Sequence, residues 1–132
     1  MKKIAHSIIP ALLLTSILLC NLVSVQATEI SPRYTGITVL TASVDVSSAG
    51  KATSNGKVML RDGYTADLTV ELKKDGSTIK TWTSSGSGIV TAGGTYYVLS
   101  GHTYTTTTTA TVYDADGNLV ESPSKTSQPK DY

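Results

Sequence analysis

Aromatic side chains are the residues of this chain best suited to bind a ligand. Four of them lie near turn-like segments: Tyr64, Trp82, Tyr96 and Tyr97. Exposed aromatic rings can stack on sugars or fill a pocket of a partner protein. The alternative is a structural role, because the chain has one Trp, seven Tyr and no Phe to fill a core. We favour a core position for Trp82 and for one of Tyr96 and Tyr97, since adjacent strand residues point to opposite faces.

The segment DADGN, Asp114 to Asn118, resembles the start of a calcium-binding loop, in which alternate oxygen side chains converge on the ion. A complete loop of that kind has a carboxylate at its twelfth position, which here is Lys125. The same residues suit a hairpin turn, with Gly117 in the left-handed region and Asp and Asn bonding to their own backbone. The sequence therefore favours a turn, and neither a metal nor another cofactor is expected.

Residues that could carry out catalysis are few. His102 has no Ser and carboxylate at a triad-like spacing, and we predict that it faces solvent in a loop. Most acids fall in turns or on outward-facing strand positions, so the paired carboxylates of a glycosidase are not expected. A Lys–Asn crosslink needs a buried Asn, and both Asn55 and Asn118 have turn-like neighbours. The sequence predicts no catalytic residue and no enzymatic activity.

The N-terminal 27 residues have the pattern of a secretory signal peptide. Lys2 and Lys3 precede an apolar stretch, and Val25 and Ala27 stand where a signal peptidase reads small or aliphatic residues. We expect cleavage after Ala27; a lipoprotein signal and an uncleaved anchor are the less favoured alternatives. Cys20, the only Cys, would leave with the signal, so no disulfide and no thiolate site is expected.

Charge gives no sign of nucleic acid or membrane binding. Removal of Lys2 and Lys3 leaves nine of the eleven Lys and Arg residues against ten Asp and Glu, and the charges are scattered. No basic patch is available to bind phosphates or to reach an anionic membrane after signal cleavage.

Period-two alternation dominates the chain after residue 27, and turns with Gly interrupt it. The clearest hairpin is ADLTVELKKDGSTIKTW, in which Asp75-Gly76 supplies the turn. A change of phase near Val39 and Leu40 predicts a bulge or a strand that changes partners. Gly56 could form a tight turn with the residue before it, but we favour a strand in which it lets a bulky side chain approach.

The pattern predicts an all-β domain of seven or eight short strands in two packed antiparallel sheets, a β-sandwich without a disulfide. We place the signal peptide at residues 1–27 and the domain at residues 28–122. Only one short strand is expected in the Gly-rich region, around Ile89 to Thr91. Pro123 and Pro129 predict a flexible C-terminal tail over residues 123–132.

The run of five threonines, Thr105 to Thr109, could be a disordered linker or a strand. Tyr104, Thr106 and Thr108 continue into Ala110 and Val112 on one face without a break, which predicts a central strand. Thr106 and Thr108 would then point into the core and need hydroxyl partners.

The segment YYVLSGHTYTTTTTATVYDADGNLVES is similar to the penultimate and last strands of immunoglobulin-like and fibronectin type III domains. In those folds the Tyr at the position of Tyr104 forms a tyrosine corner, with its hydroxyl bonded to the chain a few residues upstream. The segments ISPRYTGI, GKATSNGKV, KTWTSSGSG, TYYVLSGHTY and ATVYDADGNLVES resemble a group of small proteins that Gram-positive bacteria secrete. The resemblance implies an immunoglobulin-like β-sandwich and a secreted, extracellular location. Trp82 departs from antibody-type domains, because it follows the central hairpin and has no flanking cysteines.

The sequence thus favours a non-enzymatic, secreted, extracellular binding module. Its partner would be a protein or a glycan, and the four aromatic residues are the candidate contacts. A small secreted inhibitor or effector that acts on another protein is the alternative, and a divergent small enzyme is the least favoured reading.

Overall fold

The computed structural model describes residues 33–132, so the predicted signal peptide and the predicted start of the domain lie outside the described residues. Within residues 33–132 the structure has no helix. Nothing in this range could therefore cross a membrane as a long apolar helix. Nine strands follow one another along the chain: β1 (Ile37–Val46), β2 (Lys51–Leu60), β3 (Thr65–Lys74), β4 (Ser77–Ser87), β5 (Ile89–Tyr97), β6 (Thr103–Tyr113), β7 (Leu119–Glu121), β8 (Ser124–Thr126) and β9 (Lys130–Asp131).

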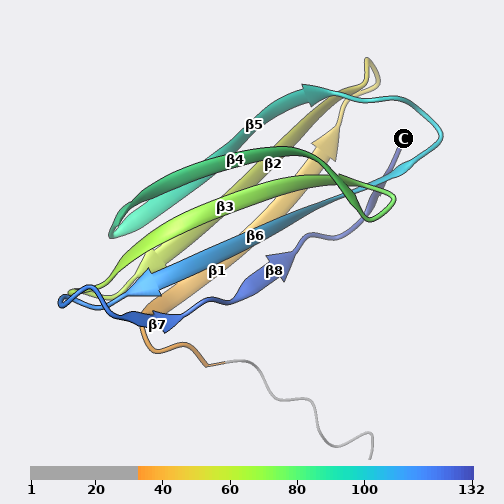
Figure 1. Ribbon diagram of the computed structural model, residues 1–132. Helices are drawn as coiled ribbons and strands as arrows, with labels where there is room; N and C mark the ends of the chain where they lie inside the picture. Colours follow the sequence, from red (N-terminus) through yellow and green to blue (C-terminus); the bar gives the residue numbers. More distant parts are fainter. Residues whose placement is uncertain (1–32) are drawn as a thin grey trace, which may run out of the picture. The chain divides into compact units, whose positions relative to one another are not determined.

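The strands form two antiparallel sheets (Figure 1). Sheet A has the order β1-β2-β5. Sheet B has the order β4-β3-β6-β7, with β8 and β9 also paired to β6. In immunoglobulin lettering these are A-B-E and C′-C-F-G, so the order agrees with the predicted immunoglobulin-like sandwich. The inward side chains of both sheets form the core, which includes Val58 from sheet A and Leu68, Val70 and Val112 from sheet B.

Local signals in the sequence locate two irregular points correctly. The register of β1 against β2 shifts between Ile37 and Val39, which confirms the predicted bulge. Asp75 and Gly76 have φ values of 49° and 86° and join β3 to β4, which confirms the predicted hairpin. Both central residues have positive φ, as the tight turns of hairpins require.

Gly56 lies in the middle of β2, as the favoured interpretation had it. A Cβ atom there would stand 2.4 Å from Thr108 Oγ1 and 2.5 Å from Val70 Cγ2, so side chains of sheet B fill the space that Gly56 leaves. β5 is longer than predicted, because Gly93 and Gly94 continue the strand and remain in register with Asn55 and Ser54. The Gly-rich composition of this segment predicted a loop, but the pairing with β2 holds Gly93 and Gly94 in the strand.

The threonine run forms β6, between β3 and the C-terminal segment in sheet B. Thr106 and Thr108 are buried in the core, and Thr106 Oγ1 donates to Ser54 Oγ at 2.9 Å. Within the described residues, the Thr108 hydroxyl is buried without a partner. The Tyr104 hydroxyl donates to the Leu99 carbonyl at 2.5 Å. The predicted central strand and the predicted tyrosine corner are both confirmed.

The prediction of a flexible tail over residues 123–132 is wrong. β8 and β9 pair with β6, so this segment belongs to sheet B; β8 is labelled in Figure 1. Outward hydroxyls of β6 bond to the segment and to the residue before it: Thr107 to Thr126, Thr109 to Ser124 and Thr111 to Ser122, at 2.8 to 3.0 Å. The prolines do interrupt the strand, but a row of hydroxyl pairs and backbone bonds holds its pieces in place.

Candidate functional site

The structure separates the four candidate aromatic residues into three places. Tyr64 is half-buried and packs over Gly36, beside Val112. Trp82 lies in β4, half-buried, and contacts both clusters of the hydrophobic core, so the favoured core interpretation holds in part. Tyr96 and Tyr97 are both exposed, by 38% and 73%, at the end of β5.

The expectation that one of Tyr96 and Tyr97 belongs to the core is therefore wrong. Tyr96 pairs with Ala52, which is fully buried, so it has the inward phase of the strand. It lies at the end of the sandwich, however, where it lines an open hollow together with Lys74, the half-buried Ile79 and Tyr104 of the opposite sheet. The phase of a strand predicts the face of a side chain, but the end of the partner sheet decides whether that side chain is covered.

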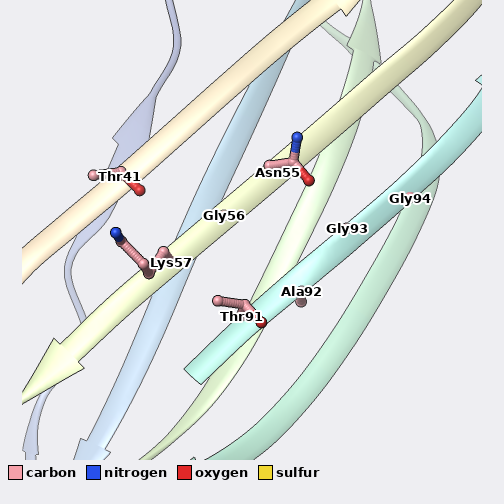
Figure 2. A pocket seen from close by; sticks show the side chains of 8 residues that line it. All are labelled: Thr41, Asn55, Gly56, Lys57, Thr91, Ala92, Gly93 and Gly94. Carbon is pink, nitrogen blue, oxygen red and sulfur yellow. The ribbon is translucent and has the colours of Figure 1, made fainter. Parts of the chain in front are cut away.

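Two hollows indent the described surface. The larger, about 490 Å³, lies on the outer face of sheet A between side chains of β1, β2 and β5 (Figure 2). The smaller, about 200 Å³, is lined by Tyr96 and Tyr97 together with Lys74, Ile79, Val98, Leu99 and Tyr104. We call the second hollow and the exposed residues around it, Tyr96, Tyr97 and Leu99, the tyrosine end.

The tyrosine end is an exposed apolar surface. Tyr97 and Leu99, which lie close together in the chain, are 73% and 71% exposed. Tyr104 lies beneath them and is fully buried. Apolar side chains that gather around a hollow are typical of surfaces that contact another molecule.

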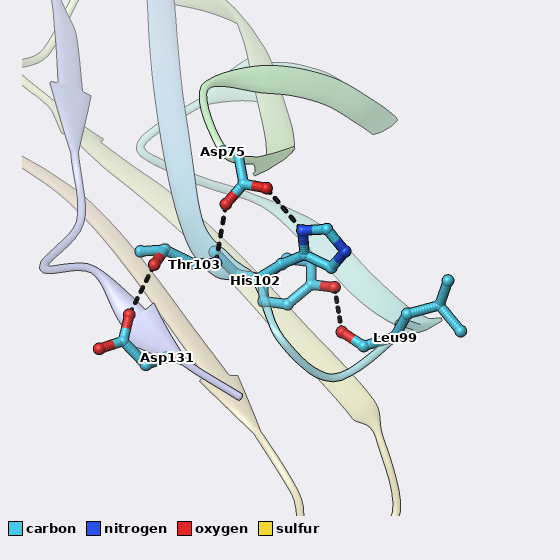
Figure 3. A network of polar contacts seen from close by, with 6 residues as sticks. Asp75, Leu99, His102, Thr103 and Asp131 are labelled. Atoms are coloured by element: carbon cyan, nitrogen blue, oxygen red, sulfur yellow. Dashed lines mark hydrogen bonds and ion pairs between the residues drawn. The ribbon is translucent and has the colours of Figure 1, made fainter.

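The loop that carries Leu99 is held from several sides. Val98 N donates to Gly50 O at 2.8 Å and the Tyr104 hydroxyl donates to Leu99 O (Figure 3). At the far side of the loop, Gly101 N donates to Tyr132 O at 2.6 Å. The C-terminal residue thus fixes the same loop, because the segment predicted to be flexible is ordered. The tyrosine end is consequently a preformed surface.

His102 and Asp75 join this loop to the β3–β4 hairpin (Figure 3). His102 Nδ1 lies 2.6 Å from Asp75 Oδ2, and Thr103 N donates to Asp75 Oδ1 at 2.9 Å. The bond from the Thr103 N–H, followed by the bond with His102, holds the pKa of Asp75 below its ordinary value. The loop position of His102 agrees with the prediction, but no signal in the sequence could find its partner, 27 residues away.

This pair is arranged to hold the hairpin against the loop. Both carboxylate oxygens of Asp75 are engaged, one by His102 and one by the backbone. The His102 ring also lies edge-on to Tyr104, with ring centroids 6.5 Å apart. The geometry therefore assigns these side chains a role in positioning the loop.

The DADGN segment forms a turn, as the favoured interpretation had it. Asp114 Oδ1 accepts from the N–H groups of Asp116 and Asn118 at 3.0 and 2.9 Å, and Gly117 has a φ of 82°. Its carboxylate oxygen is thus directed to backbone donors. Within residues 33–132, no three His, Cys, Asp or Glu side chains gather in a way that could hold a metal ion.

Comparisons with known proteins add no relative. The chain matches no protein-family model, and a comparison with curated proteins gives no significant match. The function proposed below is therefore argued from the geometry of the tyrosine end.

Proposed function

We propose that this chain is a secreted, extracellular, non-enzymatic binding module that contacts a protein partner through the tyrosine end. The observation that carries this proposal is the exposure of Tyr97 and Leu99 beside a hollow of about 200 Å³, on a loop fixed by hydrogen bonds. Tyrosine is enriched at protein interfaces because its ring gives a large contact area and its hydroxyl a polar end. Secretion is inferred from the pattern of residues 1–27 and from the resemblance to secreted Gram-positive proteins.

The charges around the tyrosine end indicate the chemistry of the partner. Lys74 lines the hollow, and Lys51 pairs with Tyr97 in the register of β2 and β5. Asp75, the nearest acid along the chain, is engaged by His102 and Thr103. A partner surface with an apolar side chain for the hollow and a nearby carboxylate for a lysine would match this arrangement.

A small secreted inhibitor or effector is the second candidate. The observation that favours it is the fixed conformation of the loop from Val98 to His102, which Gly50, Tyr104 and Tyr132 hold. A loop that is already ordered loses little conformational entropy when it enters the site of another protein. Both candidates use the same residues and differ in whether the partner loses an activity when bound.

The test is site-specific photo-crosslinking from the tyrosine end. A photoreactive phenylalanine analogue is placed at Tyr97 and, as a matched control, at Leu119, which is 64% exposed on β7. The protein recovered after expression of the full chain is added to the source organism's surface and medium fractions. We expect one dominant protein adduct from position 97 and none from position 119. Adducts of equal yield from both positions would refute the tyrosine end as the contact surface.

The captured protein then gives a quantitative check. Leu99→Asp should weaken its binding at least about tenfold, because the carboxylate disrupts an apolar contact. Leu119→Asp makes the same change at a distant exposed site and should leave binding unchanged. Secretion has its own readout: the intact mass of the protein from the culture medium should match a chain that begins at Thr28.

A further inference from the structure

The outer face of sheet A contains a hollow that the proposed function does not use. It is lined by Thr41 of β1, by Asn55 and Lys57 of β2 and by Thr91 and Gly93 of β5, and its volume is about 490 Å³ (Figure 2). The register places Asn55 opposite Gly93, and Lys57 between Thr41 and Thr91. Four polar side chains from three strands thus surround a position that has no side chain.

The hollow depends on Gly93. This residue has a φ of 138°, and a Cβ there would stand 2.1 Å from Ser54 O, so no other residue fits without a shift of the backbone. Packing explains why the neighbouring residue is a glycine, because a Cβ on Gly94 would stand 2.6 Å from Trp82 Nε1. Gly93 has the opposite phase and faces away from Trp82. Packing of the tryptophan therefore does not account for it.

Asn55 is also unusual where it stands. It occupies the outward face of β2, the central strand of sheet A, and Asn is depleted in strands. Glycine in a strand commonly marks a place where a ligand or another backbone comes close. Two residues that weaken a strand are paired at the hollow. The close backbone of Ser54 accounts for Gly93, whereas no side-chain hydrogen bond within residues 33–132 accounts for Asn55.

The polar groups around the hollow are free to bind. Within residues 33–132, no hydrogen bond or ion pair joins the side chains of Thr41, Asn55, Lys57 or Thr91 to another residue. The outer face of sheet B is different, because its threonine hydroxyls bond to Ser and Thr of the C-terminal segment. Threonine hydroxyls on the outer face thus hold the C-terminal segment on sheet B, whereas those on sheet A remain available to a ligand.

We propose that this hollow binds a short saccharide that carries an acidic group. Two hydroxyls and one amide can both donate to and accept from sugar hydroxyls, and Lys57 offers a positive charge to a carboxylate. The hollow lies on the face of the sheet, where side chains are presented and not the backbone groups of an edge, so a peptide bound in it would not extend the sheet. Its volume falls within the ~300–1,000 Å³ of small-ligand sites. Because it is open to solvent, we expect a dissociation constant of roughly 0.1–1 mM.

The test is a titration followed by two-dimensional ¹⁵N NMR, on the protein recovered after expression of the full chain. The probes are trigalacturonic acid, a glucuronic acid disaccharide and sialyllactose, each beside its neutral counterpart. We expect at least one acidic probe to shift the backbone signals of Thr91 and Gly93 and the side-chain amide of Asn55. Signals of Tyr97 and Leu99 should not move, which separates this site from the tyrosine end.

Three variants complete the test. Asn55→Ala should weaken binding of the acidic probe at least about fivefold. Lys57→Gln should bring its affinity down to that of the neutral counterpart. Lys80→Gln removes a lysine from the exposed edge strand β4 and should change nothing. The proposal is overturned if no acidic probe shifts the hollow at 10 times the expected ~1 mM upper limit, or if Asn55→Ala and Lys57→Gln bind as the unmodified protein does.

Discussion

Removal of the Tyr104 hydroxyl is the sharpest test of how the loop of the tyrosine end is held. The Tyr104 side chain is fully buried, and its hydroxyl donates to the Leu99 carbonyl at 2.5 Å. Tyr104→Phe keeps the ring and leaves no cavity of importance, so the hydroxyl and its bond are the only loss. Burial raises the pKa of this tyrosine, in keeping with a neutral hydroxyl that donates to a carbonyl.

The magnitude follows from the surroundings of the bond. A hydrogen bond between neutral groups contributes about 0.5–1.5 kcal/mol net, and a buried acceptor left without a donor adds a cost of about 1–3 kcal/mol. The bond is only partly buried and Leu99 itself is exposed, so water can replace part of what the hydroxyl gave. We therefore expect Tyr104→Phe to lower the free energy of unfolding by about 1–2 kcal/mol. For a domain of this size, that corresponds to a fall of roughly 4–15 °C in Tm.

The assay is urea denaturation monitored by the fluorescence of the single Trp, with a thermal melt beside it. Tyr97→Phe is the matched control, because it removes a hydroxyl from a side chain that is 73% exposed and should stay within about 0.5 kcal/mol of the unmodified protein. If Tyr104→Phe also stays within about 0.5 kcal/mol, the corner contributes nothing measurable and the reasoning fails.

Four further outcomes are expected. Thr108→Val should raise the free energy of unfolding by about 1 kcal/mol in urea denaturation, because it removes a buried hydroxyl that has no partner; a loss would indicate a bond to an internal water. Gly94→Ala should cost roughly 1–3 kcal/mol and shift the emission of Trp82, since the new methyl overlaps the indole; unchanged emission would contradict that contact. The pKa of Asp75 is lowered, so its carboxylate stabilises the fold above the unfolded pKa near 3.8, and this contribution vanishes as pH falls through the lower folded value. Asp75→Asn should therefore lower Tm at neutral pH and leave it unchanged at pH 2; a difference that persists in thermal melts at pH 2 would contradict this. A chain that ends at Ser122 should lose more than about 3 kcal/mol in the same denaturation assay, because several backbone bonds to β6 go with it; an unchanged midpoint would restore the flexible tail.

The two surfaces proposed for binding differ in how they are built. The tyrosine end is apolar and lies on a loop that Gly50, Tyr104 and Tyr132 hold. The hollow of sheet A is polar and is built on regular strands around Gly93. Substitutions in one share no residue with the other, so the two proposals stand or fall separately.

The tail shows where a local rule fails. Pro123 and Pro129 correctly indicate that no continuous strand can form, since proline has no N–H for the ladder. They say nothing about whether short pieces can pair. Pairing is decided by β6, whose outward hydroxyls at Thr107 and Thr109 meet Thr126 and Ser124. Partners separated by 15 or more residues cannot be read from either segment alone.

Features that depend on neighbours along the chain could be predicted from the sequence. The alternation of residues predicted the inward face of β6, and the Asp75-Gly76 pair predicted the hairpin. The tyrosine corner at Tyr104 was implied by the resemblance to immunoglobulin-like domains. These follow from steric and hydrogen-bonding preferences that act over a few residues.

Which side chains are covered, and which of them contact one another, depends on how the two sheets pack. Tyr96 has an inward phase and is still exposed, because it lines an open hollow at the end of the sandwich. Asp75 and His102 are paired, and Asn55 faces Gly93, because strands far apart in the chain lie side by side in register. Burial and contact are properties of the packed sheets, so both candidate binding surfaces exist only once the sandwich has formed.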